Sequence, residues 1–342
     1  MYETWNILSI QRKVNERVWR RTGMSMASYD DSGIGISAVA YALPDVFVEL
    51  RELEARGLLE SSADAMEEFG FRGAHISDRP GDELALQALR QLIERQGLER
   101  DSIDLLIYAG AIPESHHVTA GSPLDGFAYP ATRLLYEAGL DRAIAMGVSQ
   151  TGCTGLITAA AVAIDHLRAH PESRRVVCVS ADVLPPGARR EIIYNVVSDG
   201  ACALLVERQA TRNRILALRQ ITKGYYWNPG SCRNELVAAY FPTARTLVSR
   251  TLHDLGLTAG DVALVVPHNV SLRSWQILLP LLGLPLDRLF SDNIGRKGHV
   301  IAADNFINLK DAWDGGRIRP GDRLLLFNFG FGANWSCLAL EA

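Results

Sequence analysis

The sequence predicts an α/β protein made of two related α/β halves, and three observations point to this class. Segments with the pattern of β-strands alternate with segments of helical pattern over most of the 342 residues. Hydrophobic residues make up 48% of the chain, which is enough for a large buried core. The order strand, turn, helix, strand occurs around Cys153 and again around His299, which is typical of a weak structural repeat.

The chain divides into three parts. Residues 1–33 are polar, carry several arginines and end in a turn-rich stretch, which indicates an N-terminal extension. We expect the first α/β half over residues 34–210 and the second over residues 211–342. In sheets of this kind ligands bind beyond the carboxyl ends of the strands.

The first half is expected to start with a strand that Pro44 stops, because proline cannot continue a strand's hydrogen bonding. Asp101 and Ser102 are turn residues before the next strand, and an alanine-rich helix follows Cys153. The predicted strands of this half are 36–43, 103–109, 143–147, 176–180 and 201–206, and the predicted helices are 130–138 and 154–170.

In the second half, a continuous apolar strand runs directly into Pro267 and His268. A turn of sequence GRIRPGD, at residues 316–322, introduces a later strand. The predicted strands of this half are 262–266, 323–329 and 335–340, and the predicted helices are 272–282 and 301–313. Cys153, His268 and His299 therefore all fall at junctions between strands and helices.

Charge and composition argue against several classes of protein. Charged residues make up 22% of the chain and the formal net charge is -4, which favours neither a disordered chain nor a nucleic-acid binder. The first residues lack a signal-peptide pattern, and no run reaches the roughly 18 apolar residues of a membrane span. Five widely spaced cysteines without a CxxC pair indicate a reducing cytoplasm, with no disulfide framework and no metal site.

Cys153 is the candidate nucleophile, in the context Gln-Thr-Gly-Cys-Thr-Gly of residues 150–155. The unpaired N–H groups and partial positive charge of a helix N-terminus favour a thiolate. The flanking glycines permit the sharp turn of a nucleophile elbow, and the N–H of Cys153 would be an oxyanion donor. The competing interpretation is a small buried cysteine, which is what we expect of Cys178 and Cys202 inside apolar strands.

Two further residues are candidates for proton transfer. His268 ends an apolar strand, where it would accept the thiol proton and return it to a leaving group. Asp304 lies in an apolar stretch, where an aspartate is costly unless it is paired. A buried Asp304 bonded to His268 would orient the imidazole, as in nucleophilic triads. The alternatives are a structural histidine and a helix-capping or surface aspartate.

The auxiliary candidates are His299 and Asn305. His299 would be a second imidazole donor to an oxyanion, or a turn histidine without a role. The loop histidines His116 and His117 are further candidates to face a substrate. The glycine-rich residues 330–332 lack the full dinucleotide fingerprint, and we expect them to bring one more N–H toward the reaction centre.

These motifs together resemble the β-ketoacyl-ACP synthase III branch of the thiolase superfamily, over about residues 34–342. In chain order they are the cysteine elbow at 147–155, Ser-Asp-Gly-Ala at 198–201, Pro-His-Asn at 267–269, GRIRPGD at 316–322 and Gly-Phe-Gly-Ala-Asn-Trp at 330–335. The resemblance implies a thiolase-like fold, in which two related halves form a layered α-β-α-β-α architecture. It also implies a homodimer and an acyl carrier protein (ACP) or CoA thioester as the substrate, without a metal or redox cofactor.

The resemblance assigns roles to individual residues. Cys153 matches the acyl-accepting cysteine of the family, and His268 matches its active-site histidine. Arg273 matches a basic position near the mouth of the carrier tunnel. Gly332 falls in the loop that completes the oxyanion hole with the N–H of Cys153.

The sequence departs from the condensing members at one segment. They carry an asparagine that helps to stabilise an enolate, whereas residues 298–304 read GHVIAAD, so His299 replaces it. With Asp304, this segment resembles divergent acyltransferases of natural-product (polyketide) pathways. The resemblance then implies acyl transfer from Cys153 to a hydroxyl, an amine or a carrier thiol, on a small-molecule acceptor or a second carrier.

Three other functions stay open. Decarboxylative condensation would use Cys153, His268 and His299, because type I and II condensing enzymes combine a cysteine with two histidines and carry a similar Gly-His pair. A non-condensing partner subunit is the second, although such partners usually lose the nucleophile. Thioester hydrolysis is the third, since only a dry pocket prevents it.

Overall fold

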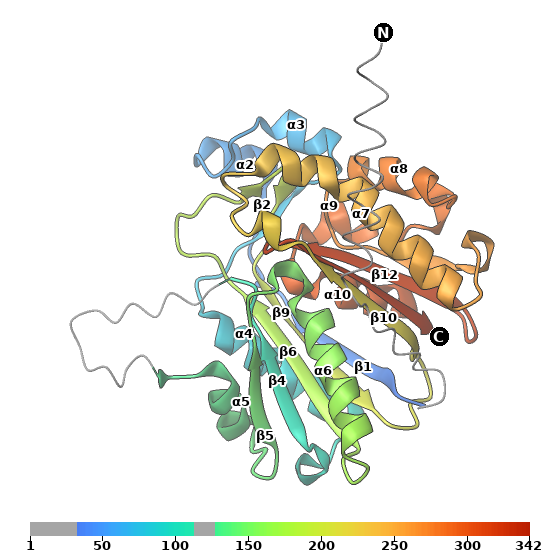
Figure 1. Cartoon of the computed structure of the whole chain (residues 1–342). Helices are drawn as coiled ribbons and strands as arrows, with labels where there is room; N and C mark the ends of the chain where they lie inside the picture. Colours follow the sequence, from blue (N-terminus) through green and yellow to red (C-terminus); the bar gives the residue numbers. More distant parts are fainter. Residues whose placement is uncertain (1–32, 113–126) are drawn as a thin grey trace.

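A nine-stranded mixed sheet organises the described part of the chain, which is residues 33–112 and 127–342 of the computed structural model (Figure 1). Its strands are β1 (Gly35–Ala42), β4 (Leu105–Ala109), β5 (Ile144–Val148), β6 (Arg175–Asp182), β9 (Gly200–Glu207), β10 (Arg214–Thr222), β11 (Leu264–Val266), β12 (Arg323–Gly330) and β13 (Asn334–Glu341). Their order across the sheet is β11-β12-β13-β10-β1-β9-β6-β4-β5. Two small ribbons join β2 (Phe47–Glu49) to β3 (Gly73–His75) and β7 (Glu191–Ile192) to β8 (Asn195–Val196).

The helices cover both faces of this sheet. They are α2 (Leu50–Ala55), α3 (Ala63–Glu68), α4 (Gly81–Gln96), α5 (Pro130–Ala138), α6 (Gly155–Ala169), α7 (Arg233–Asp254), α8 (Leu272–Leu281), α9 (Asp292–Lys297) and α10 (Asp304–Asp314). Figure 1 shows α6 lying along β6 and β4, and the helix packs against both strands.

The sheet contains one pattern of pairing twice. In β1-β9-β6-β4 and in β10-β13-β12-β11, the first two pairings are antiparallel and the third is parallel. The two groups meet between β1 and β10 through a single residue pair, Gly35 with Arg214. In chain order α6 precedes β6 and α10 precedes β12, which are matching strands of the two groups.

Three clusters of buried side chains fill the spaces between the layers. One packs α4 and α5 on the first group of strands and includes Leu89. A second lies between the two groups of strands and includes Leu156 of α6 and Phe306 of α10. The third packs α7 and α8 on the second group of strands and includes Leu247. The protein therefore has the layered α-β-α-β-α arrangement of a thiolase-like fold, as the sequence predicted.

The predicted strands and helices are present, with ends that differ by a few residues. Three long elements were missed: α4, β10 and α7. The helix α7 contains Pro242, and a proline at such a position argues against predicting a helix from the sequence. The limits of α4 have clear signals, because it follows Pro80 and ends at the left-handed Gly97.

Among the described residues, no helix is long and apolar enough to cross a bilayer. Residues 1–32 of the predicted extension lie outside the described part of the chain, and so do the loop histidines His116 and His117.

Candidate active site

Cys153 lies on a sharp turn between β5 and α6. It occupies a short 3-10 turn, Gly152–Thr154, that follows a left-handed Gln150 with φ of 65°. Gly152 is also left-handed, and a Cβ at this position would lie 2.6 Å from the carbonyl oxygen of Phe331. Only glycine allows this close approach, so the predicted nucleophile elbow is present. It packs directly on the backbone between β12 and β13, residues 330–333, which we call the C-terminal loop.

The C-terminal loop meets this elbow at Gly330 and Phe331. A Cβ on Gly330 would lie 2.7 Å from the amide nitrogen of Cys153. Phe331 lines the cavity beside the nucleophile, whereas Gly332 does not and instead lies next to Gln150 and Asn334. Gly332 stays a predicted oxyanion donor, and the N–H of Phe331 is a second candidate partner of the Cys153 N–H.

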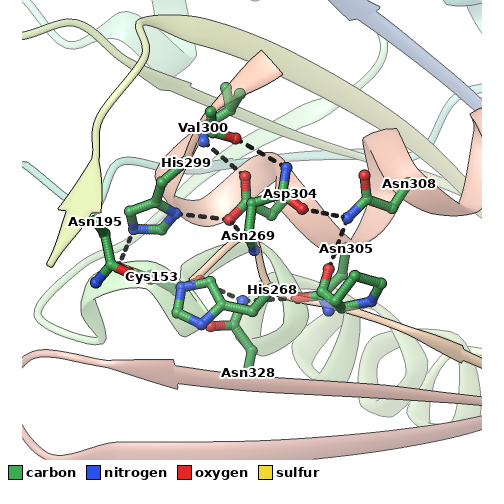
Figure 2. A network of polar contacts seen from close by, with 12 residues as sticks. Cys153, Asn195, His268, Asn269, His299, Val300, Asp304, Asn305, Asn308 and Asn328 are labelled. Atoms are coloured by element: carbon green, nitrogen blue, oxygen red, sulfur yellow. Dashed lines mark hydrogen bonds and ion pairs between the residues drawn. The ribbon is translucent and has the colours of Figure 1, made fainter. Parts of the chain in front are cut away.

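Asp304 pairs with His299, and not with His268 as the sequence analysis proposed. The Nδ1 atom of His299 lies 2.6 Å from Oδ2 of Asp304, and its Nε2 atom lies 3.5 Å from Sγ of Cys153. Figure 2 shows the His299 ring between the other two side chains. The three residues thus form a Cys-His-Asp triad in which His299 takes the central place.

The Asp304 carboxylate is fully enclosed and well supplied with donors. Besides His299, it accepts hydrogen bonds from the backbone N–H groups of Val300 (2.6 Å) and Asn269 (2.7 Å). Its side chain has no exposed surface. These contacts replace the water that a buried carboxylate loses, and they fix the direction in which it faces His299.

The backbone around His299 is held by the Ser-Asp-Gly-Ala segment of residues 198–201 and the residues just before it. The His299 N–H donates to the Val196 carbonyl at 2.8 Å, and its own carbonyl accepts from the Ser198 N–H at 2.9 Å. The next residue, Asp199, forms a buried ion pair with Arg190 at 2.5 Å. The segment therefore positions His299 and does not itself face the cavity.

The charges around the two histidines give them different protonation states. Burial acts to lower the pKa of His299, but the Asp304 carboxylate and Cys153 outweigh it and raise the pKa to about 10. Burial, with His299 as a second cause, holds the pKa of His268 well below its usual value. At neutral pH His299 is consequently a cation paired with Asp304, while His268 is neutral.

His268 lies beside the triad, and neither of its ring nitrogens has a hydrogen-bond partner among the described residues. Its ring meets that of His299 edge to face, with centroids 4.7 Å apart. It is only 2% exposed and lines the cavity. The proposed orientation of His268 by Asp304 is wrong because both carboxylate oxygens of Asp304 are engaged elsewhere, with His299 and the two backbone N–H groups.

Asn305 lies behind the nucleophile and does not line the cavity. Its amide donates to the carbonyls of Val266 (2.9 Å) and Phe327 (3.1 Å), and its Oδ1 accepts from Asn328 at 2.7 Å. Asn328 also donates to the carbonyl of Cys153 at 2.9 Å, a contact that the sequence analysis missed. The direct catalytic role considered for Asn305 is therefore replaced by a positioning role through Asn328 (Figure 2).

A second chain of amides supports Asp304. Asn308, one turn after Asp304 on α10, donates to Oδ1 of Asn269 at 2.7 Å. The Asn269 amide donates to the Gly298 carbonyl at 2.8 Å, directly before His299. The helix α10 therefore connects to the nucleophile through Asn305 and to the His299 turn through Asn308.

A largely apolar cavity of about 210 Å³ opens in front of the triad. Its lining includes the polar residues Asn195, Ser274 and the two histidines, and Tyr240 and Phe329 form part of its aromatic wall. Arg273 does not line the cavity, but it is exposed on α8 next to Ser274, which does. The site thus combines a buried nucleophile, a histidine–aspartate pair and an apolar chamber, which suits an acyl group.

Known proteins share this sequence pattern and this fold. The family described as 3-oxoacyl-[acyl-carrier-protein (ACP)] synthase III C terminal matches residues 252–342. The β-ketoacyl-ACP synthase III of Aquifex aeolicus (strain VF5) is 26% identical over 271 residues, which are 75% of this chain and 83% of that protein. The enzyme of the same name from Synechocystis sp. (strain PCC 6803) is 26% identical over 336 residues, 89% of this chain and 97% of that protein.

The chain is thus similar to β-ketoacyl-ACP synthase III enzymes over most of its length, and its residues 252–342 match the C-terminal family of these enzymes. Two solved structures share the fold of this synthase III-like chain. The crystal structure of 3-oxoacyl-ACP synthase III from Aquifex aeolicus VF5 has a TM-score of 0.77 and 22% identity, covering 90% of this chain and 100% of that one. The acyltransferase ChlB3 has a TM-score of 0.78 and 24% identity, covering 90% of this chain and 97% of that one.

Proposed function

We propose that this synthase III-like chain is an acyltransferase that moves an acyl group from an ACP or CoA thioester to a hydroxyl, an amine or a carrier thiol. The observation that carries the proposal is the line of contacts from Asp304 through His299 to Cys153. The arrangement supplies a nucleophile, a proton acceptor and an orienting carboxylate from side chains alone, so the proposed reaction uses no metal or redox cofactor.

In the first half of the proposed reaction, the Cys153 sulfur attacks the thioester carbonyl and forms a carbon–sulfur bond. The negative charge on the carbonyl oxygen is met by the N–H groups of Cys153 and Phe331. The intermediate then collapses and breaks the bond to the carrier sulfur. His299 gives a proton to that leaving thiolate, so the acyl group stays on Cys153 and His299 becomes neutral.

In the second half, the acceptor donates a proton to Nε2 of His299 as its oxygen, nitrogen or sulfur attacks the acyl group. The bond to Cys153 breaks, and the sulfur leaves as a thiolate beside the His299 cation. Asp304 stabilises that cation and keeps Nε2 facing the reaction. The same carboxylate makes the site less suited to decarboxylation, because its negative charge opposes the charge that develops on an enolate.

Two surface features support the proposed partners. The exposed Arg273, next to the cavity-lining Ser274, offers a cation to the phosphate of a phosphopantetheine carrier or CoA. The strand β5 lies at the edge of the sheet with Ile144 63% and Met146 40% exposed. An exposed apolar edge strand is a template for pairing with a second copy, which supports the proposed homodimer.

The test is intact-mass analysis of the whole protein after incubation with acetyl-CoA, malonyl-CoA, benzoyl-CoA and the corresponding acyl-ACPs. We expect an acyl adduct with at least one thioester on the wild type and none on Cys153→Ala. A matched Cys232→Ala variant should acylate normally, because Cys232 does not line the cavity. The absence of any adduct, or an equal adduct on Cys153→Ala, contradicts the proposal.

Decarboxylative condensation is a second candidate, and the unpartnered His268 favours it. A neutral imidazole with both nitrogens free can donate a hydrogen bond to an enolate oxygen without bringing negative charge. Release of carbon dioxide from malonyl thioester with formation of a β-ketoacyl product identifies condensation. An ester, amide or new thioester without carbon dioxide identifies transfer, and a free acid without acceptor identifies hydrolysis.

A further inference from the structure

Cys153, His268 and His299 form a compact cluster of metal-ligand atoms. One atom of each residue, the cysteine sulfur or a ring nitrogen, can be chosen so that all lie within 4.8 Å of one another. The three residues are 8%, 2% and 5% exposed. We propose that this cluster is a binding site for a divalent transition-metal ion of the zinc type, which occupies the nucleophile reversibly and blocks its acylation.

The ligand types and their spacing match this class of ion. A thiolate and two imidazoles are typical ligands of Zn²⁺ and Co²⁺. Tetrahedral bonds of about 2.3 Å to sulfur and 2.0 Å to nitrogen place the two atoms about 3.5 Å apart. The sulfur of Cys153 and Nε2 of His299 are already 3.5 Å apart, so two of the ligands have the required separation.

A metal-bound histidine usually donates a hydrogen bond from its other ring nitrogen, and Asp304 is the acceptor in this position. Its Oδ2 atom holds Nδ1 of His299 at 2.6 Å, which leaves Nε2 as the atom that faces a cation. A carboxylate–histidine–metal arrangement of this kind fixes the imidazole and strengthens it as a ligand. The thiolate and the Asp304 carboxylate together balance the two positive charges of the ion, so a bound metal leaves the buried site neutral.

His268 is the independent observation that points to a ligand. Both of its ring nitrogens are buried, and no residue in the described part of the chain is hydrogen-bonded to them, an arrangement that is costly unless something else occupies the space beside them. A shift of the His268 ring by on the order of 1 Å would bring one of its nitrogens into a tetrahedral position around the ion. No side-chain hydrogen bond from the described residues opposes this movement. A water in the adjoining cavity of about 210 Å³ supplies the fourth ligand.

Metal and acyl group exclude each other in this site, because both bind the sulfur of Cys153. Metal binding displaces the proton on Nε2 of His299, which passes to solvent, and the ion takes its place between the ring and the Cys153 sulfur. The inference goes beyond the proposed acyl transfer and does not depend on it, since the ion can be detected on the resting protein.

The experiment uses Co²⁺ with the full chain, after treatment with a chelator and a non-thiol reductant. We expect one Co²⁺ per chain and a thiolate-to-cobalt charge-transfer band in the near ultraviolet. The band should disappear in Cys153→Ala and persist in Cys232→Ala, which removes a partly exposed cysteine elsewhere. The affinity should fall at least tenfold in His268→Ala and in His299→Ala, and about 10- to 100-fold in Asp304→Asn.

A second histidine pair has to be separated from this cluster. His166 and His170 lie four residues apart on and just after α6, with ring centroids 4.4 Å apart, and such a pair can bind a metal without a thiolate. The variant His170→Gln should therefore keep the charge-transfer band and the affinity of the wild type. If this variant instead loses the affinity for Co²⁺, the ion lies at the surface pair and the proposal is wrong.

Zinc should also protect Cys153 from alkylation. We expect Zn²⁺ to slow the reaction of iodoacetamide with Cys153 at least tenfold by intact-mass analysis, and a chelator to restore it. A cobalt band that survives Cys153→Ala, or an affinity unchanged in both histidine variants, overturns the proposal. Circular dichroism of each variant distinguishes a lost ligand from a lost fold. If Zn²⁺ protects Cys153 from iodoacetamide but none of the thioesters acylates the protein, the proposed acyl transfer is wrong and the metal site still stands.

Discussion

The Nδ1 atom of His299 lies 2.6 Å from Oδ2 of Asp304, although residues five apart do not share a face of a helix. The contact forms because His299 stands before a 3-10 turn, Ile301–Ala303, and the helix α10 starts only at Asp304. Ile301 in that turn has a φ of 47°, which is costly for a β-branched residue. Backbone strain of this kind occurs at functional sites, where the surrounding structure holds it in place.

Asp304→Asn should slow acyl transfer and leave the fold intact. An amide of the same shape does not stabilise the His299 cation, so we expect transfer from Cys153 to the acceptor to slow by a factor of about 10³ to 10⁴. Rapid-quench measurement of the acyl adduct gives this rate. Asp314→Asn, on the exposed end of the same helix, is the matched control and should react like the wild type. Equal rates in the two variants would argue against the triad.

The stability of the protein should depend on the charge of His299. The pKa of this residue is about 10 in the folded protein and about 6.5 in the unfolded chain, so the folded state binds the proton more tightly. The stabilisation is therefore fully present below pH 6.5 and is lost as the pH rises through about 10. In urea unfolding, the stability difference between the wild type and His299→Gln should shrink between pH 7 and pH 10. A constant difference over this range would contradict the assignment.

Acylation should lower the pKa of His299. Cys153 is one of the groups that raise this pKa, and a thioester on its sulfur carries no charge. Alkylation of Cys153 with iodoacetamide imitates that state. We expect the His299 ring signals, followed by nitrogen NMR of labelled protein, to titrate at lower pH after alkylation. Unchanged titration would show that the thiolate does not act on the imidazole.

Asn328→Leu should reduce the rate without weakening substrate binding. Asn328 donates to the Cys153 carbonyl at 2.9 Å and to Asn305 at 2.7 Å, and leucine of similar size leaves both acceptors unpaired. We expect a loss of about 1–3 kcal/mol in the free energy of unfolding. The kcat should fall with little change in KM, because the elbow loses its support behind the nucleophile. A change in KM alone would place Asn328 in substrate binding instead.

Arg273→Glu should weaken use of a carrier-bound thioester several-fold, mainly through KM, and added salt should no longer weaken carrier binding as it does in the wild type. The same variant should process a short soluble acyl thioester like the wild type, because Arg273 does not line the cavity. Reduced activity with both substrates would contradict a role for Arg273 at the carrier entrance.

The sequence predicts the layered fold and the nucleophile well because both depend on local signals. Strand and helix patterns and the glycines around Cys153 are short-range features. The partner of Asp304 depends instead on a backbone turn at Ile301, and no residue type in that segment predicts this turn. Asn328 reaches Cys153 from 175 positions away, and no spacing in the sequence predicts such a contact. The apolar sequence around Asp304 was thus enough to identify this carboxylate as a candidate, whereas its partner His299 could be identified only from the structure.

Cys153 and His299 come from equivalent places in the two groups of strands, one before α6 and the other before α10. The two strand groups meet through a single residue pair, Gly35 with Arg214. The distance between sulfur and imidazole is therefore set by how one half of the molecule docks on the other. Substitutions where the two strand groups meet therefore offer a way to change the reaction rate, in evolution or by engineering, without altering a reacting side chain.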